Sequence, residues 1–244
     1  MILAGIQNAA IIDSQLNTSR MTRKGKFKIY LPQMHADKRK IKGLYAIIDN
    51  SIRPDLSNIE IAKKVLAGGA RIIQLRGKGL SSRELLEQAR EIRELTRKVG
   101  ATFIVNDRAD IALLSEADGV HLGQDDLPIS EARKILGTAK LIGISTHNLG
   151  QAMKAEQEGA DYIGFGPVFG TKTKSDVEEA KGLQALREVK GNVKVPVVAI
   201  GGINLESLKD VIDAGADGVA VISAVVKAKN IEEATKGFIE VFKG

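Results

Sequence analysis

The stretch DAGADGVAV, residues 213–221, predicts the fold because three other segments share its pattern. These segments are AGGARIIQL (67–75), SEADGVHLG (115–123) and QEGADYIGF (157–165). In each one, Gly, Ala or Asp residues end a helical pattern and an apolar run follows. Glycine at a helix C-terminus adopts the left-handed conformation at little cost. The repeated unit is therefore a helix followed by a buried strand.

Eight short apolar runs follow one another from residue 42 onward. They span 44–48, 72–75, 102–105, 119–122, 141–144, 162–165, 196–200 and 218–222. Such near-continuous apolar runs are typical of parallel strands that are buried on both faces. Helical patterns lie between them, as at 82–98, where Leu85, Leu86, Ala89, Ile92 and Leu95 form one apolar stripe.

Eight strand and helix units over ~200 residues predict an α/β fold, a closed (β/α)8 TIM barrel. We expect residues 41–244 to form this barrel as a single catalytic domain. A doubly wound open sheet is the alternative, but it usually needs fewer strands and carries an early Gly-rich fingerprint that is missing here.

Residues 1–40 form a basic leader without a sustained helical or strand period. They hold eight Lys or Arg and two Asp, which accounts for the whole net charge of +6, because the remaining 28 basic and 28 acidic residues cancel. We expect a poorly ordered extension, or the product of an upstream start codon that the cell does not use. The neutral barrel is not a basic nucleic-acid-binding surface, so we expect no nucleic-acid partner.

Composition excludes several other classes of protein. The chain has no cysteine, which removes disulfides, thiolate catalysis and Cys-based zinc sites. No apolar run approaches the ~20 residues of a membrane span, and no basic residues precede the apolar N-terminus as in a signal peptide. We expect a cytoplasmic protein that acts on small molecules without a membrane partner. A homo-oligomer is compatible with the sequence, which does not fix the oligomeric state.

Polar residues gather where the predicted strands end. The active site of a (β/α)8 barrel lies at the C-terminal ends of the strands, called here the rim. The segments that follow the eight strands are 49–50, 74–78, 106–107, 121–126, 145–147, 166–174, 201–202 and 222–223. These segments supply most of the candidate site residues.

The charged rim residues form two opposed sets. The cations are Arg76, Lys78, Lys172 and Lys174, and the anions are Asp107, Asp125 and Asp126. Oxygen ligands without thiols or clustered histidines favour Mg²⁺ over Zn²⁺. Lys and Arg bind phosphate oxygens, so the combination predicts a site for a diphosphate and Mg²⁺.

A second phosphate site is predicted on the other side of the rim. Gly201-Gly202 and Ile222-Ser223 occupy the usual phosphate-binding position of a barrel. Backbone N–H groups at a helix N-terminus bind phosphate without a basic side chain. A diphosphate site and a separate monophosphate site together indicate two substrates that are joined.

The rim motifs resemble those of the thiamine phosphate synthase family. The matching segments are Gln74-x-Arg-x-Lys78, Asn106-Asp107, GVHLGQDDL (119–127), GIST (143–146), GPVFGTKTK (166–174), AIGGI (199–203) and GVAVIS (218–223). Each motif alone is weak, but the ordered series over 42–244 is specific. Two departures are Gly77, where many members have Glu, and the long leader.

The resemblance implies a transferase that uses Mg²⁺. Hydroxymethylpyrimidine diphosphate and thiazole phosphate, or its carboxylated form, would give thiamine phosphate and pyrophosphate through a pyrimidine carbocation. The resemblance assigns the pyrimidine diphosphate to Gln74, Arg76, Lys78, Asn106, Ser145 and Lys174, Mg²⁺ to Asp107 and Asp126, and the thiazole phosphate to Thr171, Thr173, Gly202, Ile222 and Ser223. It makes Arg76, Ser145 and Lys174 the catalytic residues.

Several residues also have a structural interpretation. Asp107 and Asp126 could cap the helices that follow them, and His121 could be a core histidine. Ser145 and His147 are not expected to form a catalytic dyad, and Asp49 and Asp125 receive no role.

Two rival functions remain, a thiazole tautomerase and a non-catalytic barrel that binds a phosphate-bearing ligand. The combination of Asn106, Asp107, Asp126 and Lys174 argues against the tautomerase, and the intact rim argues against a non-catalytic barrel. Residues 166–177 exceed an ordinary connection of ~2–6 residues and are predicted to close over the substrates.

Overall fold

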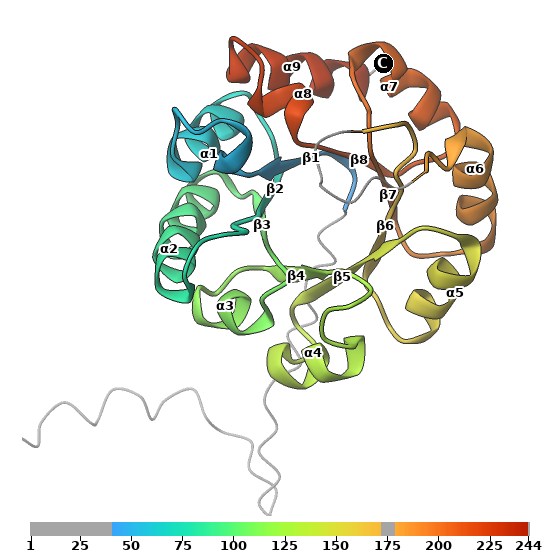
Figure 1. Ribbon diagram of the computed structural model, residues 1–244, viewed down its shortest axis with the longest axis horizontal. Helices are drawn as coiled ribbons and strands as arrows, with labels where there is room; N and C mark the ends of the chain where they lie inside the picture. Colours follow the sequence, from blue (N-terminus) through green and yellow to red (C-terminus); the bar gives the residue numbers. More distant parts are fainter. Residues whose placement is uncertain (1–40, 172–178, 244) are drawn as a thin grey trace, which may run out of the picture. The chain divides into compact units, whose positions relative to one another are not determined.

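The computed structural model describes residues 41–171 and 179–243, in which eight parallel strands form a closed barrel in sequence order (Figure 1). The strands are β1 (Gly43–Ile48), β2 (Ile72–Leu75), β3 (Thr102–Asn106), β4 (Gly119–Leu122), β5 (Leu141–Thr146), β6 (Tyr162–Phe165), β7 (Val197–Ile200) and β8 (Gly218–Val221). The predicted (β/α)8 barrel is confirmed. The predictions for 1–40, Lys172, Thr173 and Lys174 lie outside the described residues.

A ring of helices surrounds the strands (Figure 1). A 3₁₀ turn, η1 (Asn50–Ile52), and the helices α1 (Asn58–Ala67), α2 (Ser82–Val99), α3 (Ala109–Leu114), α4 (Ile129–Leu136), α5 (Leu149–Gln157), α6 (Gly182–Asn192), α7 (Leu205–Asp213), α8 (Ser223–Val226) and α9 (Ile231–Val241) make up this ring. The predicted apolar stripe of α2 packs against the core, with Leu85, Ala89 and Ile92 buried. No helix in the described part of the chain is long and apolar enough to cross a membrane.

The four repeated segments share a left-handed turn before their strands. Gly69, Gly159 and Gly215 have φ of 95°, 91° and 96°, and Glu116 takes the equivalent place with φ of 55°. The left-handed region costs a residue with a side chain more than it costs glycine. The repeat therefore reflects a backbone requirement, and Glu116 is the strained member.

Three of these segments then place an aspartate at the start of a strand, namely Asp118, Asp161 and Asp217. Each carboxylate accepts a 2.8 Å hydrogen bond from a backbone N–H of the preceding strand and also pairs with a basic side chain of a helix. The N–H donors are those of Phe103, Ile142 and Val197, and the basic partners are Arg93, Arg133 and Lys190. The Asp of the repeat thus ties β3, β5 and β7 to their neighbours at the end of the barrel opposite the rim.

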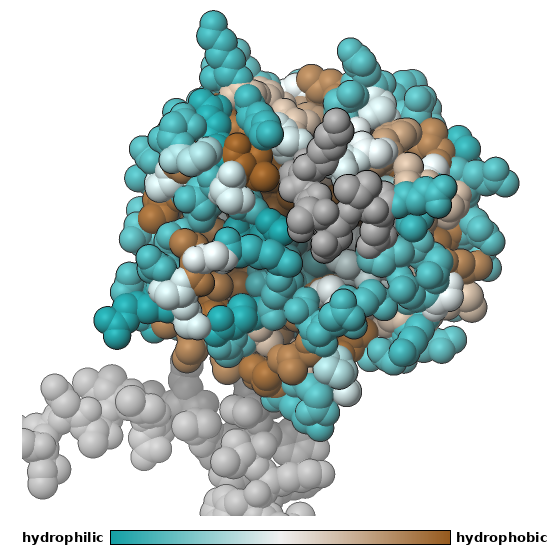
Figure 2. All heavy atoms as spheres, in the orientation of Figure 1, coloured by the Kyte–Doolittle hydropathy of each residue, from teal (hydrophilic) through white to brown (hydrophobic). Residues whose placement is uncertain are grey.

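Hydrophilic side chains dominate the face of the barrel seen in Figure 2, with hydrophobic ones scattered between them. The buried apolar side chains form a single core of strand and helix residues. The buried polar side chains include Asp49, Gln74 and His121, which belong to the site at the rim.

Candidate active site

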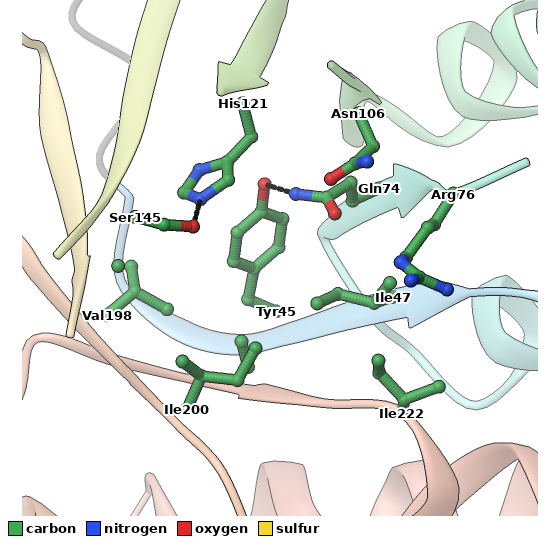
Figure 3. A pocket seen from close by; sticks show the side chains of 12 residues that line it. Tyr45, Ile47, Gln74, Arg76, Asn106, His121, Ser145, Val198, Ile200 and Ile222 are labelled. Carbon is green, nitrogen blue, oxygen red and sulfur yellow. Dashed lines mark hydrogen bonds between the residues drawn. The ribbon is translucent and has the colours of Figure 1, made fainter. Parts of the chain in front are cut away.

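A pocket opens at the rim, between the C-terminal ends of the strands (Figure 3). One side is polar and the other apolar. The lining residues are Tyr45, Ile47, Gln74, Arg76, Asn106, His121, Ser145, Gly164, Val198, Ile200, Ala220 and Ile222. Five of the predicted site residues, Gln74, Arg76, Asn106, Ser145 and Ile222, therefore meet in one pocket although they come from four different strands or the loops after them.

Arg76 reaches the pocket in a fixed position. Its guanidinium donates to the Oδ2 atom of Asp49, whose Oδ1 accepts from the backbone N–H of Ser51 at 3.0 Å and from its hydroxyl at 2.6 Å. Asp49 is buried, with 1% of its surface exposed. A buried carboxylate needs a partner, so Asp49, which the sequence left without a role, holds Arg76 at the rim.

Asp107 and Asp126 form a pair of carboxylates beside this pocket. Burial, and then the negative charge of Asp126, raise the pKa of Asp107 to about 6. Lys78 counters this only weakly, because its Nζ lies 3.9 Å from Asp107 and its side chain is well exposed. Asp126 accepts a hydrogen bond of 2.6 Å from the N–H of Gly123. Two crowded carboxylates gain from a shared cation.

The helix-capping interpretation of these two aspartates is wrong. The residue before α3 is Arg108 and the residue before α4 is Pro128, and neither helix has a side-chain cap. Asp107 instead adopts φ of 63° directly after β3. Asp and Asn tolerate this region better than most residues, so Asp107 turns the chain at the rim and keeps its carboxylate on the Asp126 side.

The histidine that contacts Ser145 is His121, and His147 is not its partner. His121 Nε2 lies 3.0 Å from Ser145 Oγ, as Figure 3 shows, whereas His147 Nδ1 lies 2.7 Å from the carbonyl oxygen of Gly166. Ser145 and His147 thus have different hydrogen-bond partners, and His121 is a bonded, buried histidine, as its structural interpretation held. Its contact with Ser145 was not predicted, and the signal for it was a polar residue inside the apolar run 119–122.

The loops after β6 and β7 pack closely against one another. The N–H of Val168 donates to the carbonyl oxygen of Ile200 at 2.8 Å. A side chain at Gly202 would place its Cβ 2.6 Å from the carbonyl oxygen of Gly170, so glycine is required there. Thr171 is the last residue described in the first of these loops. Ser223 begins α8, next to Ile222 in the pocket.

Together these features define a class of protein, a (β/α)8 barrel whose polar and charged groups converge at the C-terminal ends of the strands, as they do in barrel enzymes. Comparison with known proteins narrows the class. The sequence profile described as thiamine monophosphate synthase matches residues 44–225. The chain belongs to the thiamine monophosphate synthase family.

Individual relatives are similar to this chain along nearly their whole length. The thiamine-phosphate synthase of Moorella thermoacetica is 50% identical over 198 residues, which cover 81% of this chain and 94% of that protein. The one from Methanospirillum hungatei is 50% identical over 199 residues, 82% and 97% of the two chains. The thiamine phosphate pyrophosphorylase structure from Pyrococcus furiosus is similar with a TM-score of 0.77 and 42% identity, and the match covers 84% and 97% of the two chains. The predicted family and its transferase function in thiamine biosynthesis are confirmed.

Proposed function

We propose that the chain joins 4-amino-5-hydroxymethyl-2-methylpyrimidine diphosphate to 4-methyl-5-(2-phosphoethyl)thiazole, giving thiamine phosphate and pyrophosphate, with Mg²⁺ as cofactor. The observation that carries the assignment of roles is the rim itself, where Arg76 and Lys78 face the Asp107 and Asp126 carboxylates next to one pocket. We also expect the chain to act on these small molecules in the cytoplasm, which its similarity to thiamine-phosphate synthases supports.

Asp107 and Asp126 are the residues that would hold Mg²⁺. Their fit rests on the chemistry of the pair, because burial and mutual repulsion make the second ionisation unfavourable unless a cation is shared. Within residues 41–171 and 179–243 no three His, Asp or Glu side chains cluster as a metal site. Two carboxylates suit Mg²⁺, which takes its other ligands from phosphate and water. The ion would neutralise charge on the diphosphate.

The diphosphate would be bound by fixed cations. Arg76 is already held by Asp49, and its guanidinium needs little reorganisation when the diphosphate arrives. Lys78 extends from the same loop and is free to move, since its side chain is 63% exposed. Lys174 is assigned to the departing pyrophosphate from the sequence alone and lies outside the described residues. Such preorganised charges stabilise the leaving group as it departs.

The pyrimidine ring would occupy the pocket, where Gln74, Asn106 and Ser145 present polar groups. The bond between the diphosphate oxygen and the methylene carbon attached to the pyrimidine ring breaks, and its electron pair leaves with pyrophosphate. The lone pair of the thiazole nitrogen then forms the new bond to that carbon. This nitrogen carries no proton to remove, so the step needs no general base.

The apolar wall of the pocket protects this reaction from water. Ile47, Val198, Ile200 and Ile222 line the side opposite the polar groups (Figure 3). A carbocation that meets water is lost to hydrolysis, and a site that excludes water prevents this side reaction. We assign the thiazole phosphate to the loops around Thr171, Gly202, Ile222 and Ser223, and Thr173 to the same site from the sequence alone.

Release of pyrophosphate by the purified full chain tests this proposal. The wild type should release pyrophosphate only when both substrates and Mg²⁺ are present. Asp107→Asn and Asp126→Asn should each lower kcat by roughly 10²–10³, the usual loss of one electrostatic contribution. Asp125→Asn changes an exposed neighbouring carboxylate and serves as the matched control. Full activity in the presence of EDTA would contradict the metal assignment.

A further inference from the structure

A chain of hydrogen bonds crosses the inside of the barrel and connects two ends of the pocket. Gln74 Nε2 donates to Tyr45 Oη at 2.8 Å, and Tyr45 Oη lies 2.8 Å from Tyr162 Oη. Tyr162 Oη lies 3.1 Å from His121 Nδ1, and His121 Nε2 lies 3.0 Å from Ser145 Oγ. Gln74 and Ser145 line the pocket, while Tyr162 lies behind its wall. Figure 3 shows the two outer contacts of this chain.

The barrel provides space for these rings through two glycines. A Cβ at Gly143 would lie 2.1 Å from the Tyr162 ring, and a Cβ at Gly164 would lie 3.1 Å from the His121 ring. The rings of Tyr45 and Tyr162 contact edge to face with centroids 6.0 Å apart. The side chains of this hydrogen-bond chain therefore have little freedom to move.

Both phenols keep their protons inside the barrel. Tyr45 and Tyr162 are 2% and 0% exposed, and burial raises the pKa of each well above its usual value. Each hydroxyl therefore donates one hydrogen bond and accepts others.

Assigning each proton to one hydrogen bond gives all the bonds of this hydrogen-bond chain the same direction. The amide nitrogen of Gln74 can only donate, so Tyr45 accepts from it and donates its own hydrogen bond to Tyr162, its other partner among the described residues. By the same argument Tyr162 donates to His121 Nδ1, the remaining partner that the described residues give it. A ring nitrogen that accepts carries no proton, so His121 carries its proton on Nε2 and donates to Ser145 Oγ.

Gln74 and Ser145, the two ends of the hydrogen-bond chain, are consequently coupled. Ser145 accepts from His121 and is left to donate its own proton into the pocket, while Gln74 keeps Oε1 as the acceptor of its amide. The reverse order would need Gln74 to turn Oε1 toward Tyr45. Every hydroxyl would then reverse, His121 would carry its proton on Nδ1, and Ser145 would donate to His121.

We propose that Tyr45, Tyr162 and His121 are positioning residues, which fix an acceptor at Gln74 and a donor at Ser145 and so select the pyrimidine. This inference rests on the proposed function. An aminopyrimidine offers an N–H donor from its amino group and an acceptor from a ring nitrogen, which matches these two ends. A 4-oxo analogue offers a carbonyl where the amino group was, and two acceptors then face each other at Gln74. Binding of the 4-oxo analogue therefore requires every hydrogen bond of the hydrogen-bond chain to reverse its direction.

Two matched variants test the selection. Tyr162→Phe interrupts the chain in the middle, and Tyr45→Phe releases the Gln74 amide, yet each removes only one buried hydroxyl. Thr235→Val is the control, since it removes a buried hydroxyl that is bonded at 2.7 Å to a carbonyl oxygen in α9, and Thr235 is not among the residues that line the pocket. Thermal unfolding shows whether the three variants lose comparable stability.

The readout is the ratio of kcat/KM for the 4-amino and the 4-oxo pyrimidine diphosphates in pyrophosphate release. We expect the ratio to fall about 10-fold in Tyr162→Phe and Tyr45→Phe, the effect of one lost hydrogen bond with its orientation, and to stay at the wild-type value in Thr235→Val. The KM for thiazole phosphate should not change. A ratio within twofold of the wild type in both Tyr variants overturns the proposal.

Histidine ¹⁵N NMR of the full chain at neutral pH tests the proton order without turnover. The chain has three histidines, so His35→Gln and His147→Gln leave the signal of His121 identified. We expect a neutral ring with its proton on Nε2, and a change of this signal in Tyr162→Phe but not in Thr235→Val. A proton on Nδ1 overturns the proposal. A wild type that releases pyrophosphate from neither substrate would refute the proposed function, and the NMR result would then decide the proton order alone.

Discussion

Replacing Asp107 by Asn should stabilise the metal-free barrel at neutral pH, although it removes a proposed ligand of Mg²⁺. The reason is the raised pKa of Asp107, about 6 against a usual 3.8, which burial and the Asp126 carboxylate cause. The folded state therefore favours the protonated form. Stability from this group is fully present below about pH 3.8 and is lost as the pH rises through about 6.

The magnitude follows from the two pKa values. The difference between 3.8 and about 6 corresponds to about 3 kcal/mol at ~1.4 kcal/mol per pH unit. The side chain is 27% exposed, and solvent screening reduces this to about 1–1.5 kcal/mol. Asn tolerates the φ of 63°. The variant also loses the long ion pair with Lys78, which costs under ~0.5 kcal/mol. The net gain is about 1 kcal/mol, or ~2–4 °C in Tm.

Urea unfolding after dialysis against EDTA measures this gain, with Asp125→Asn as the control. At about pH 7.5, Asp107→Asn should exceed the wild type by about 1 kcal/mol, and the difference should vanish well below pH 3.8, where Asp107 is protonated in both the folded and the unfolded state. Added Mg²⁺ should then stabilise the wild type and leave Asp107→Asn unchanged, because a ligand stabilises only the state that binds it.

Two results would refute this reasoning. A variant less stable than the wild type at about pH 7.5 would mean that the Asp107 carboxylate is well paired in the fold. A gain of equal size at both pH values would mean that the effect does not come from ionisation.

Three further changes test how the fold supports the site. Asp161→Ala removes the acceptor of the Ile142 N–H and the partner of Arg133, so thermal unfolding should show a loss of about 1–3 kcal/mol; a loss under 0.5 kcal/mol would contradict the proposed tie. Gly143→Ala should lower the free energy of unfolding by a similar ~1–3 kcal/mol, because the new methyl group overpacks the Tyr162 ring. The ring must shift to make room, so pyrophosphate release should also fall, and an unchanged rate would contradict this. Glu116→Gly should gain ~0.5 kcal/mol in urea unfolding by relieving the φ of 55°, whereas Glu116→Ala, which keeps the strain and loses an exposed ion pair, should gain nothing.

The sequence by itself determined the barrel and the members of its rim. The predicted runs 72–75, 119–122 and 162–165 coincide with β2, β4 and β6, because a strand buried on both faces must be apolar throughout and is bounded by the residues that turn the chain. The rim residues followed from the same pattern. All strands of a parallel barrel end on one side, so whatever follows each strand meets there.

Only the tertiary structure decided which rim residues act on one another. Asp49 and Arg76 are far apart in the sequence and meet because β1 and β2 are neighbours. His121 contacts Ser145 because the register pairs His121 with Gly143, two residues before Ser145 on β5, and both side chains point into the barrel. His147 is nearer in sequence but lies beyond the end of β5, which finishes at Thr146. Hydrogen-bond partners and the pKa of Asp107 depend on burial and on distances between residues of different strands. The spacing of residues along the sequence does not give these distances.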